Sequence, residues 1–290
     1  MSVKGMLEFA YHTPETVEEA VELLAKYGSD AKVFAGGTDL LPKMKAQVLN
    51  PKHVISLKNI QSLRYLEFDE ENGLRFGAAV PIRKVENFPP VKQYYPALYE
   101  GAHSIASTQI RNAGTLVGNI CNAVPSADSA PGMLVLGAIL HVVSVRGKRE
   151  LPIHELFTGV CKTSLAPDEL VTGITIPTPA KNSANCYIPF TVRRALDLAM
   201  VSSAVNLTME DGICKDVKIA LGAVAITPKR ADNAEALLMG QKLTDELIEK
   251  AAEVASTQDC SPITDLRATR EYRTELVRVL TRDAIRACIR

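Results

Sequence analysis

The sequence predicts an α+β protein with two domains. Its 290 residues exceed the length of one typical domain, and 47% hydrophobic with 23% charged residues is the composition of a globular chain. Apolar runs with strand and helix spacing alternate, and a polar, proline-containing stretch at residues 177–185 interrupts them. We therefore expect a first domain at residues 1–178, built from two α/β subdomains, and a second at residues 186–290, an antiparallel sheet with helices.

The first domain is expected to open with a helix and a strand. Thr13-Pro14-Glu15 offers a hydroxyl cap, a proline for the first turn and an acid at the positive end of the helix, and Gly28 would end it. A buried strand at residues 31–35 should follow. Later apolar runs predict further strands, at residues 53–57, 65–68, 140–145 and 170–176.

The second domain is expected to combine a hairpin with a helical tail. Residues 200–209 alternate as a strand, Asp211-Gly212 is a typical hairpin turn, and residues 213–221 return as the next strand. Helices are predicted at residues 231–238, at 244–255 and from about 268 to the end. The tail from Arg267 to Arg290 holds seven arginines, which predicts either a solvated helix face or a docking surface for a partner.

Charge and cysteine content exclude several function classes. Thirty-three basic residues balance thirty-three acidic ones, so no overall field favours nucleic acid. The longest charge-free run, residues 129–145, is shorter than the roughly 20 residues of a membrane span. The N-terminus lacks a signal-peptide core, so we expect a cytoplasmic chain with reduced cysteines. The six cysteines form no C-x-x-C motif and the histidines are scattered, so we expect no metal.

Residues 33–41 carry the first functional prediction. An apolar run ends at two glycines, followed by a hydroxyl and a carboxylate: Val33-Phe34-Ala35-Gly36-Gly37-Thr38-Asp39-Leu40-Leu41. Paired glycines permit positive φ and leave the main chain open, so several N–H groups can donate to one phosphate. Asp39 would repel an anion, and we expect it to cap the segment that follows it. A plain Gly-Gly turn is the alternative interpretation.

Residues 107–120 carry the second functional prediction. This stretch mixes small residues, hydroxyls and amides with little charge, and Gly114 and Gly118 would let the chain turn tightly. Thr115 and Asn119 would then hold a polar ligand without a neutralising lysine. Downstream, the isolated Asp128 could accept a hydrogen bond from a ribityl or ribose hydroxyl, or form a local Asx turn.

The common catalytic motifs are missing from the sequence. It contains no G-x-G-x-x-G, no G-x-x-x-x-G-K-[ST], no G-x-S-x-G and no H-E-x-x-H. The residues predict a ligand cradle without a catalytic residue, and chemistry would come from a bound cofactor.

The two glycine segments, in this order and separation, resemble those of the FAD-binding subunit of molybdenum hydroxylases, a family that includes xanthine dehydrogenase and carbon monoxide dehydrogenase. The resemblance covers nearly the whole chain. It is carried by Ala35-Gly36-Gly37-Thr38-Asp39-Leu40, Gln109-Ile110-Arg111-Asn112, Thr115-Leu116-Val117-Gly118-Asn119, Asp128, Arg193-Arg194-Ala195-Leu196-Asp197-Leu198-Ala199, Asp265-Leu266-Arg267-Ala268-Thr269 and Glu271-Tyr272-Arg273. It departs from the family pattern at Val117, where many relatives have glycine, and at Pro189, where relatives often have lysine.

The resemblance implies an N-terminal FAD domain of the vanillyl-alcohol-oxidase type and a C-terminal α+β domain. Because no histidine lies in either glycine segment, FAD is expected to be noncovalent. The implied cofactor-binding residues are Lys32, Val33, Phe34, Ala35, Gly36, Gly37, Thr38, Asp39, Thr115, Leu116, Val117, Gly118, Asn119, Asp128 and Leu170.

The resemblance also implies partner subunits and a direction of electron flow. Family members work beside a large molybdopterin-binding subunit and a small subunit with [2Fe-2S] clusters. Electrons from a substrate, here a purine or another N-heterocycle, would pass through the clusters to FAD and on to NAD or another acceptor. One alternative is a self-sufficient FAD-dependent oxidase or reductase of the same flavin fold, and another is a scaffold protein without cofactor.

Overall fold

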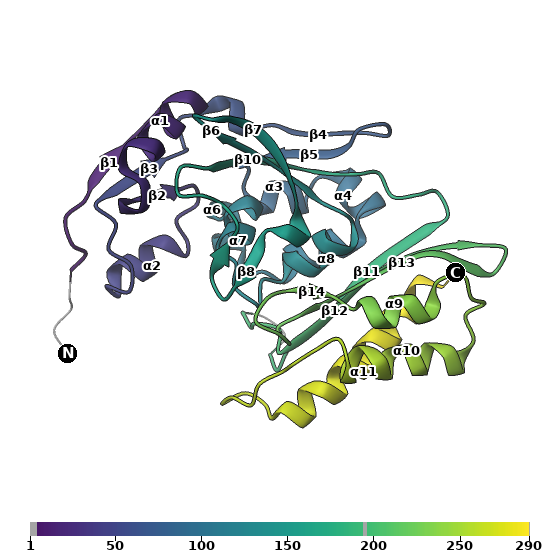
Figure 1. The fold of residues 1–290 in the computed structure, drawn as a ribbon. Coiled ribbons are helices and arrows are strands. Elements are labelled where there is room, and N and C mark those ends of the chain that lie inside the picture. Colours follow the sequence, from purple (N-terminus) through teal and green to yellow (C-terminus); the bar gives the residue numbers. More distant parts are fainter. Residues whose placement is uncertain (1–4, 194–195, 290) are drawn as a thin grey trace.

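The computed structural model describes residues 5–193 and 196–289, which form mixed helix and sheet structure. Figure 1 shows a small N-terminal unit, a central unit of sheet and helices, and a C-terminal sheet covered by helices. The mixed fold class is confirmed.

The N-terminal unit is a parallel sheet with two helices. Strands β1 (Ala10–His12), β3 (His53–Ser56) and β2 (Ala31–Phe34) lie in that order. Helix α1 (Val17–Tyr27) joins β1 to β2, and α2 (Leu40–Lys45) lies between β2 and β3.

The start of α1 was predicted three residues too early. The cap is Thr16 rather than Thr13, because the Thr16 hydroxyl accepts a hydrogen bond from the N–H of Glu19 at 3.1 Å. The predicted end is confirmed, since Gly28 caps the helix with φ +52°.

The central unit is a five-stranded antiparallel sheet with helices inserted between two of its strands. The strands in spatial order are β4 (Leu66–Asp69), β5 (Gly73–Gly77), β10 (Leu170–Ile176), β6 (Ile139–Ser144) and β7 (Gly147–Pro152). The inserted helices are α3 (Ile82–Glu86), α4 (Pro89–Tyr94), α5 (Pro96–Ser104), α6 (Thr108–Ala113), α7 (Leu116–Cys121) and α8 (Ser129–Val135). A small pair, β8 (Phe157–Gly159) and β9 (Lys162–Thr163), and 3-10 turns at Gly28–Asp30, Gln61–Leu63 and Ile153–Glu155 complete the domain.

The C-terminal sheet is antiparallel and carries the predicted hairpin. Its order is β11 (Ser183–Phe190), β12 (Val201–Glu210), β13 (Ile213–Gly222) and β14 (Lys229–Arg230). Both turn residues between β12 and β13 have positive φ, +52° at Asp211 and +76° at Gly212, as a tight hairpin requires. Helices α9 (Asp232–Leu238), α10 (Asp245–Thr257) and α11 (Arg270–Cys288) follow. β11 begins at Ser183, inside the segment that we expected to be a linker.

This sheet is buried on both faces. Tyr187, Ala204 and Ala220 lie opposite one another in register and pack into the core of the central unit. Their neighbours alternate to the other face, where Val205 and Ile219 belong to the core around α11. Helices α5 and α8 therefore lie against one face and α11 against the other (Figure 1). One consequence is that β11 contacts α5, which precedes the second glycine segment, and α8, which follows it.

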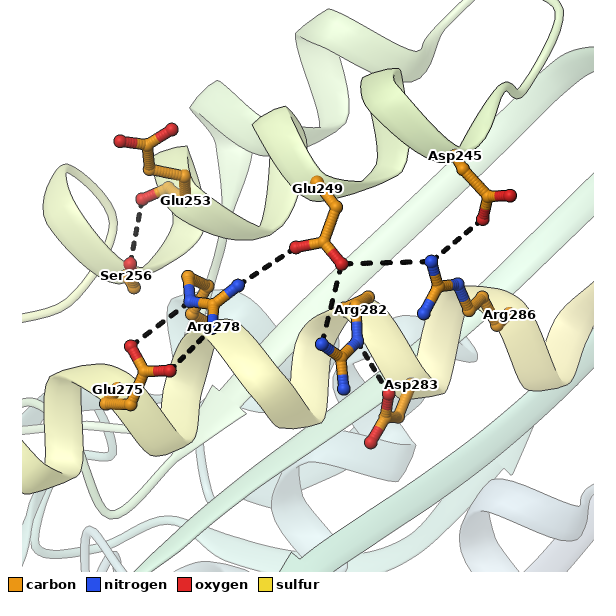
Figure 2. Close-up of polar contacts among 9 residues, drawn as sticks. All are labelled: Asp245, Glu249, Glu253, Ser256, Glu275, Arg278, Arg282, Asp283 and Arg286. Carbon is orange, nitrogen blue, oxygen red and sulfur yellow. Dashed lines mark hydrogen bonds and ion pairs between the residues drawn. The ribbon is translucent and has the colours of Figure 1, made fainter.

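The arginines of the tail pair mainly within the chain. Figure 2 shows Arg278, Arg282 and Arg286 on α11 reaching Glu249 and Asp245 on α10. The shortest interhelical contacts are Arg278 Nη1 to Glu249 Oε2 at 2.9 Å and Arg286 Nη2 to Asp245 Oδ1 at 2.8 Å. These three arginines thus join two helices of the same domain. Arg290 lies outside the described residues.

We predict that the double variant Arg278→Glu/Arg282→Glu loses stability. Each new carboxylate would face Glu249, and we expect the free energy of unfolding to fall by roughly 1–3 kcal/mol. The measurement is urea unfolding, with Lys181→Glu/Arg267→Glu as a matched control, because neither side chain forms an ion pair among the described residues. Unchanged stability together with lost co-purification of partner subunits would instead identify a docking surface.

Candidate functional site

A cavity of about 810 Å³ lies where the N-terminal unit meets the central unit. Its walls come from segments distant in sequence: the end of β2 and the start of α2, the α6–α7 region, the start of α8, the β9–β10 connection and residues 196–198. Thirteen of the fifteen predicted residues line it: Lys32, Val33, Ala35, Gly36, Gly37, Thr38, Asp39, Thr115, Val117, Gly118, Asn119, Asp128 and Leu170. The sequence therefore located the walls of one cavity.

The two remaining predicted residues lie in hydrophobic cores. The Phe34 ring is 8% exposed and packs with Met44 and Val54 behind the glycine segment. Leu116 is 1% exposed and lies in the core of the central unit. Both support the cavity wall from behind without lining it.

The glycine pair is needed for two different reasons. Gly37 has φ +72°, and a Cβ there would lie 2.2 Å from the Phe34 ring. At Gly36 a Cβ would lie 2.2 Å from the carbonyl oxygen of Ala113, so glycine lets the two predicted segments approach each other. The backbone N–H groups of Gly37 and Thr38 donate no hydrogen bond within the described part of the chain. They remain available to a ligand in the cavity.

Asp39 does not act as predicted. It occupies the cap position of α2, but its carboxylate accepts no capping hydrogen bond. The backbone alone starts this helix, because the N–H of Leu41 donates to the carbonyl of Gly37 at 3.0 Å.

The second segment is two short helices rather than a loop. Ser107 and Thr115 cap them, with hydroxyls that accept from the N–H groups of Ile110 and Gly118. Gly118 is helical, so the predicted tight turn at this residue is wrong. The Thr115 hydroxyl and the Asn119 amide are partly used within the chain, since Asn119 Oδ1 accepts from the Ser129 hydroxyl at 2.7 Å.

Asp128 is a buried carboxylate at the cavity wall. It is 5% exposed, and its Oδ1 accepts a hydrogen bond from the Tyr187 hydroxyl at 2.8 Å. Burial raises the pKa of the Asp128 carboxyl to about 6, and the Tyr187 hydrogen bond opposes that rise. The alternative of a local Asx turn is not what the structure has, because the carboxylate makes no capping bond to α8.

Lys43 and Cys121 are among the cavity residues that the sequence did not indicate. Lys43 lines the cavity, and its Nζ donates to Asn122 Oδ1 at 2.6 Å, so the site does contain a lysine that can neutralise an anion. Cys121, which directly follows the second glycine segment, also lines it. Burial raises the pKa of the Cys121 thiol to about 12, which keeps the sulfur protonated and unreactive at neutral pH.

Arg111, from the resembling motif, supports the wall without lining the cavity. Its guanidinium pairs with Glu86 at 3.1 Å and donates to the carbonyls of Ile105 and Ala106. Ala106 lines the cavity with φ +45°. The hydrogen bonds from Arg111 thus support an uncommon backbone conformation at the cavity wall.

Several other predicted features also have a place in the structure. Val117 lines the cavity as a buried residue of α7, whereas Pro189 lies on β11 opposite Ser202 and away from the cavity. Of residues 193–199, Arg194 and Ala195 lie outside the described part of the chain, and 196–198 line the cavity.

Among the described residues, no helix is long and apolar enough to cross a membrane, and no group of three or more His, Cys, Asp or Glu side chains is arranged for a metal ion.

Comparison with known proteins assigns both parts of the chain. Residues 7–179 match the family of the FAD binding domain in molybdopterin dehydrogenase, and residues 189–288 match the CO dehydrogenase flavoprotein C-terminal domain. The chain is 33% identical to the xanthine dehydrogenase FAD-binding subunit of Escherichia coli O157:H7, covering 97% of this chain and 96% of the relative. It is 35% identical to the nicotine 6-hydroxylase medium subunit of Paenarthrobacter nicotinovorans, covering 95% of each.

A solved structure agrees. A chain of the carbon monoxide dehydrogenase from Hydrogenophaga pseudoflava superimposes with a TM-score of 0.93 at 33% identity, covering 98% of both chains. This chain therefore belongs to the family of FAD-binding medium subunits of the molybdenum hydroxylases.

Proposed function

We propose that FAD is bound noncovalently in the 810 Å³ cavity, with its diphosphate on the backbone of Gly36, Gly37 and Thr38. The observation that carries this proposal is the pair of N–H groups at Gly37 and Thr38, which have no acceptor among the described residues and lie in a segment whose glycines leave no Cβ in the way. Lys32 and Lys43 at the same cavity supply positive charge for a diphosphate.

The remaining walls suit the other parts of the cofactor. Asp128 presents a carboxylate that can accept a hydrogen bond from a ribityl hydroxyl. Leu170 and Val117 give an apolar surface on which a flavin ring can lie. When bound, FAD supplies the electron-transfer chemistry, and the residues of the chain position it.

We further propose that the chain is the electron outlet of a larger enzyme. By this proposal residues 1–178 hold FAD and residues 186–290 form the second domain, in a cytoplasmic complex with a molybdopterin-binding large subunit and a [2Fe-2S] small subunit. Electrons would leave FAD for NAD or another acceptor. The names of the xanthine dehydrogenase and nicotine 6-hydroxylase relatives support a purine or another N-heterocycle as the substrate of the complex.

We predict that the cofactor leaves the polypeptide on denaturation. The experiment is to purify the chain, unfold it, filter it and measure flavin absorbance in the filtrate. Yellow filtrate is expected, because the contacts offered by the cavity are hydrogen bonds and ion pairs. Chromophore retained with the polypeptide would show covalent attachment, and a chain that never binds flavin, even when titrated with FAD, would refute the proposed function.

A further inference from the structure

The strongest unexplained feature at the cavity is the contact between Asp128 and Tyr187. Asp128 begins α8 in the first domain, and Tyr187 lies on β11 of the C-terminal sheet, 59 residues later. Both side chains are buried, at 5% and 4% exposure. The C-terminal domain therefore reaches the cavity wall through this phenol group as well as through residues 196–198, and the proposed FAD contacts do not explain the phenol.

The direction of the hydrogen bond follows from the surroundings of the phenol. Burial, together with the Asp128 charge, raises the pKa of Tyr187 well above its usual value, while the hydroxyls of Ser202 and Ser104 oppose the rise. The phenol therefore keeps its proton at all ordinary pH values and donates a hydrogen bond to Asp128 Oδ1. Among the described residues, Tyr187 is the side chain that donates a hydrogen bond to the Asp128 carboxylate.

Few charges act on this carboxylate. Tyr187 on β11 faces it, and Asp197, in the segment after β11, acts on it as a like charge. From α5 and β12, the groups that reach the Tyr187 hydroxyl are the uncharged Ser104 and Ser202. Among the described groups that shift the ionisation of Asp128, no cation offsets its burial. The phenol is thus the group that favours the ionised carboxylate.

We propose that Tyr187 is a positioning residue for FAD binding: its hydroxyl holds Oδ1 of Asp128, and thereby aims an ionised carboxylate at the cavity with Oδ2 left to accept a ligand hydroxyl. This inference rests on the proposed FAD site. It assigns the C-terminal domain an indirect part in cofactor binding, because the donor that positions Asp128 comes from its first strand. It also makes FAD binding dependent on pH through Asp128.

The sign of the pH dependence follows from the donor. Tyr187 favours the charged form of Asp128, so its removal raises the pKa of the Asp128 carboxyl above about 6. Flavin binding uses the ionised carboxylate as an acceptor. As the pH is lowered, the variant should therefore lose FAD binding at a higher pH than the wild type does. A rise of one pKa unit corresponds to an affinity that becomes about tenfold weaker once the pH lies below the original pKa.

The test is titration of apoprotein with FAD from pH 5 to 8.5, followed by quenching of flavin fluorescence. For Tyr187→Phe, a rise of one pKa unit predicts about fivefold weaker binding near pH 6, approaching tenfold toward pH 5, and a binding midpoint moved to higher pH. Tyr95→Phe is the matched control, because this buried tyrosine donates to the carbonyl of Ile176 away from the cavity. Thermal melting of each apoprotein checks that it is folded.

Asp128→Asn separates positioning from a structural effect. Asparagine does not titrate, so its FAD binding should be weak and independent of pH, and adding Tyr187→Phe should change it little. Two outcomes would overturn the inference while the wild type still bound FAD. One is an unchanged pH profile of FAD binding in Tyr187→Phe. The other is that Tyr187→Phe weakens FAD binding as much in the Asp128→Asn background as it does in the wild type. Failure of the wild type to bind FAD at any pH would refute the proposed function and the inference with it.

Discussion

Gly37→Val abolishes FAD binding in a chain that still folds. Valine would have to adopt φ +72°, which a β-branched residue resists, at a strain of roughly 1–3 kcal/mol. Its Cβ would also collide with the Phe34 ring, which is fixed between Met44 and Val54. The segment must move, and the N–H groups of residues 37 and 38 move with it. We expect FAD affinity to fall by about 100-fold or more, equivalent to roughly 3 kcal/mol.

A second glycine provides the control for this variant. Gly212, in the hairpin between β12 and β13, has φ +76°, and a Cβ added there would meet no atom within 4 Å. Gly212→Val therefore imposes a similar backbone strain far from the cavity, and it should bind FAD as the wild type does. Circular dichroism reports folding and equilibrium dialysis reports FAD. Full FAD binding by folded Gly37→Val would show that the diphosphate lies elsewhere.

The elements of the fold were predictable where the signal was local. Residues 170–176 form β10 as predicted. Thr244 caps α10, since its hydroxyl accepts a hydrogen bond from the N–H of Leu247. The hairpin at Asp211-Gly212 also follows from its own two residues. Even the corrected start of α1 has a local signal, because Thr16 and Glu19 have the spacing of a capping box.

The short helices α6 and α7 were missed for a different reason. Each has six residues, too few for a hydrophobic period, and both are rich in small and polar side chains. Each helix starts where the hydroxyl of Ser107 or Thr115 accepts a hydrogen bond from the N–H group three residues later. The sequence showed these hydroxyls, but we assigned Thr115 to a ligand.

The contacts that define the cavity could not be predicted, because they join residues far apart in sequence. Lys43 meets Asn122 across 79 positions, and Asp128 meets Tyr187 across 59. No local sequence pattern marks either contact, because each one forms only when the sheets and helices pack together. The glycines were readable because glycine marks turns and close approaches of the backbone, whereas a lysine or a tyrosine fits many places.

We predict that the isolated chain hydroxylates no substrate, and that NADH reduces its bound FAD if NAD is the acceptor of the complex. Leu170 and residues 196–198 also line the cavity, and we propose that they would flank the ring of an FAD whose diphosphate lies on the first glycine segment. NADH can then pass a hydride to FAD, giving NAD⁺ and, with one proton, FADH₂. Hydroxylation needs the molybdopterin subunit that we propose as a partner.

Anaerobic mixing of the FAD-loaded chain with NADH tests both halves of this prediction. Loss of flavin absorbance near its visible maximum, with one NADH consumed per FAD, is the expected result. Dithionite serves as the control that the flavin is reducible at all. If dithionite bleaches the flavin and NADH does not, NAD is removed as the acceptor, whereas the FAD site is unaffected. Turnover of a purine or nicotine by this chain alone would overturn its assignment as the electron outlet, because the same polypeptide would then both oxidise the substrate and release the electrons.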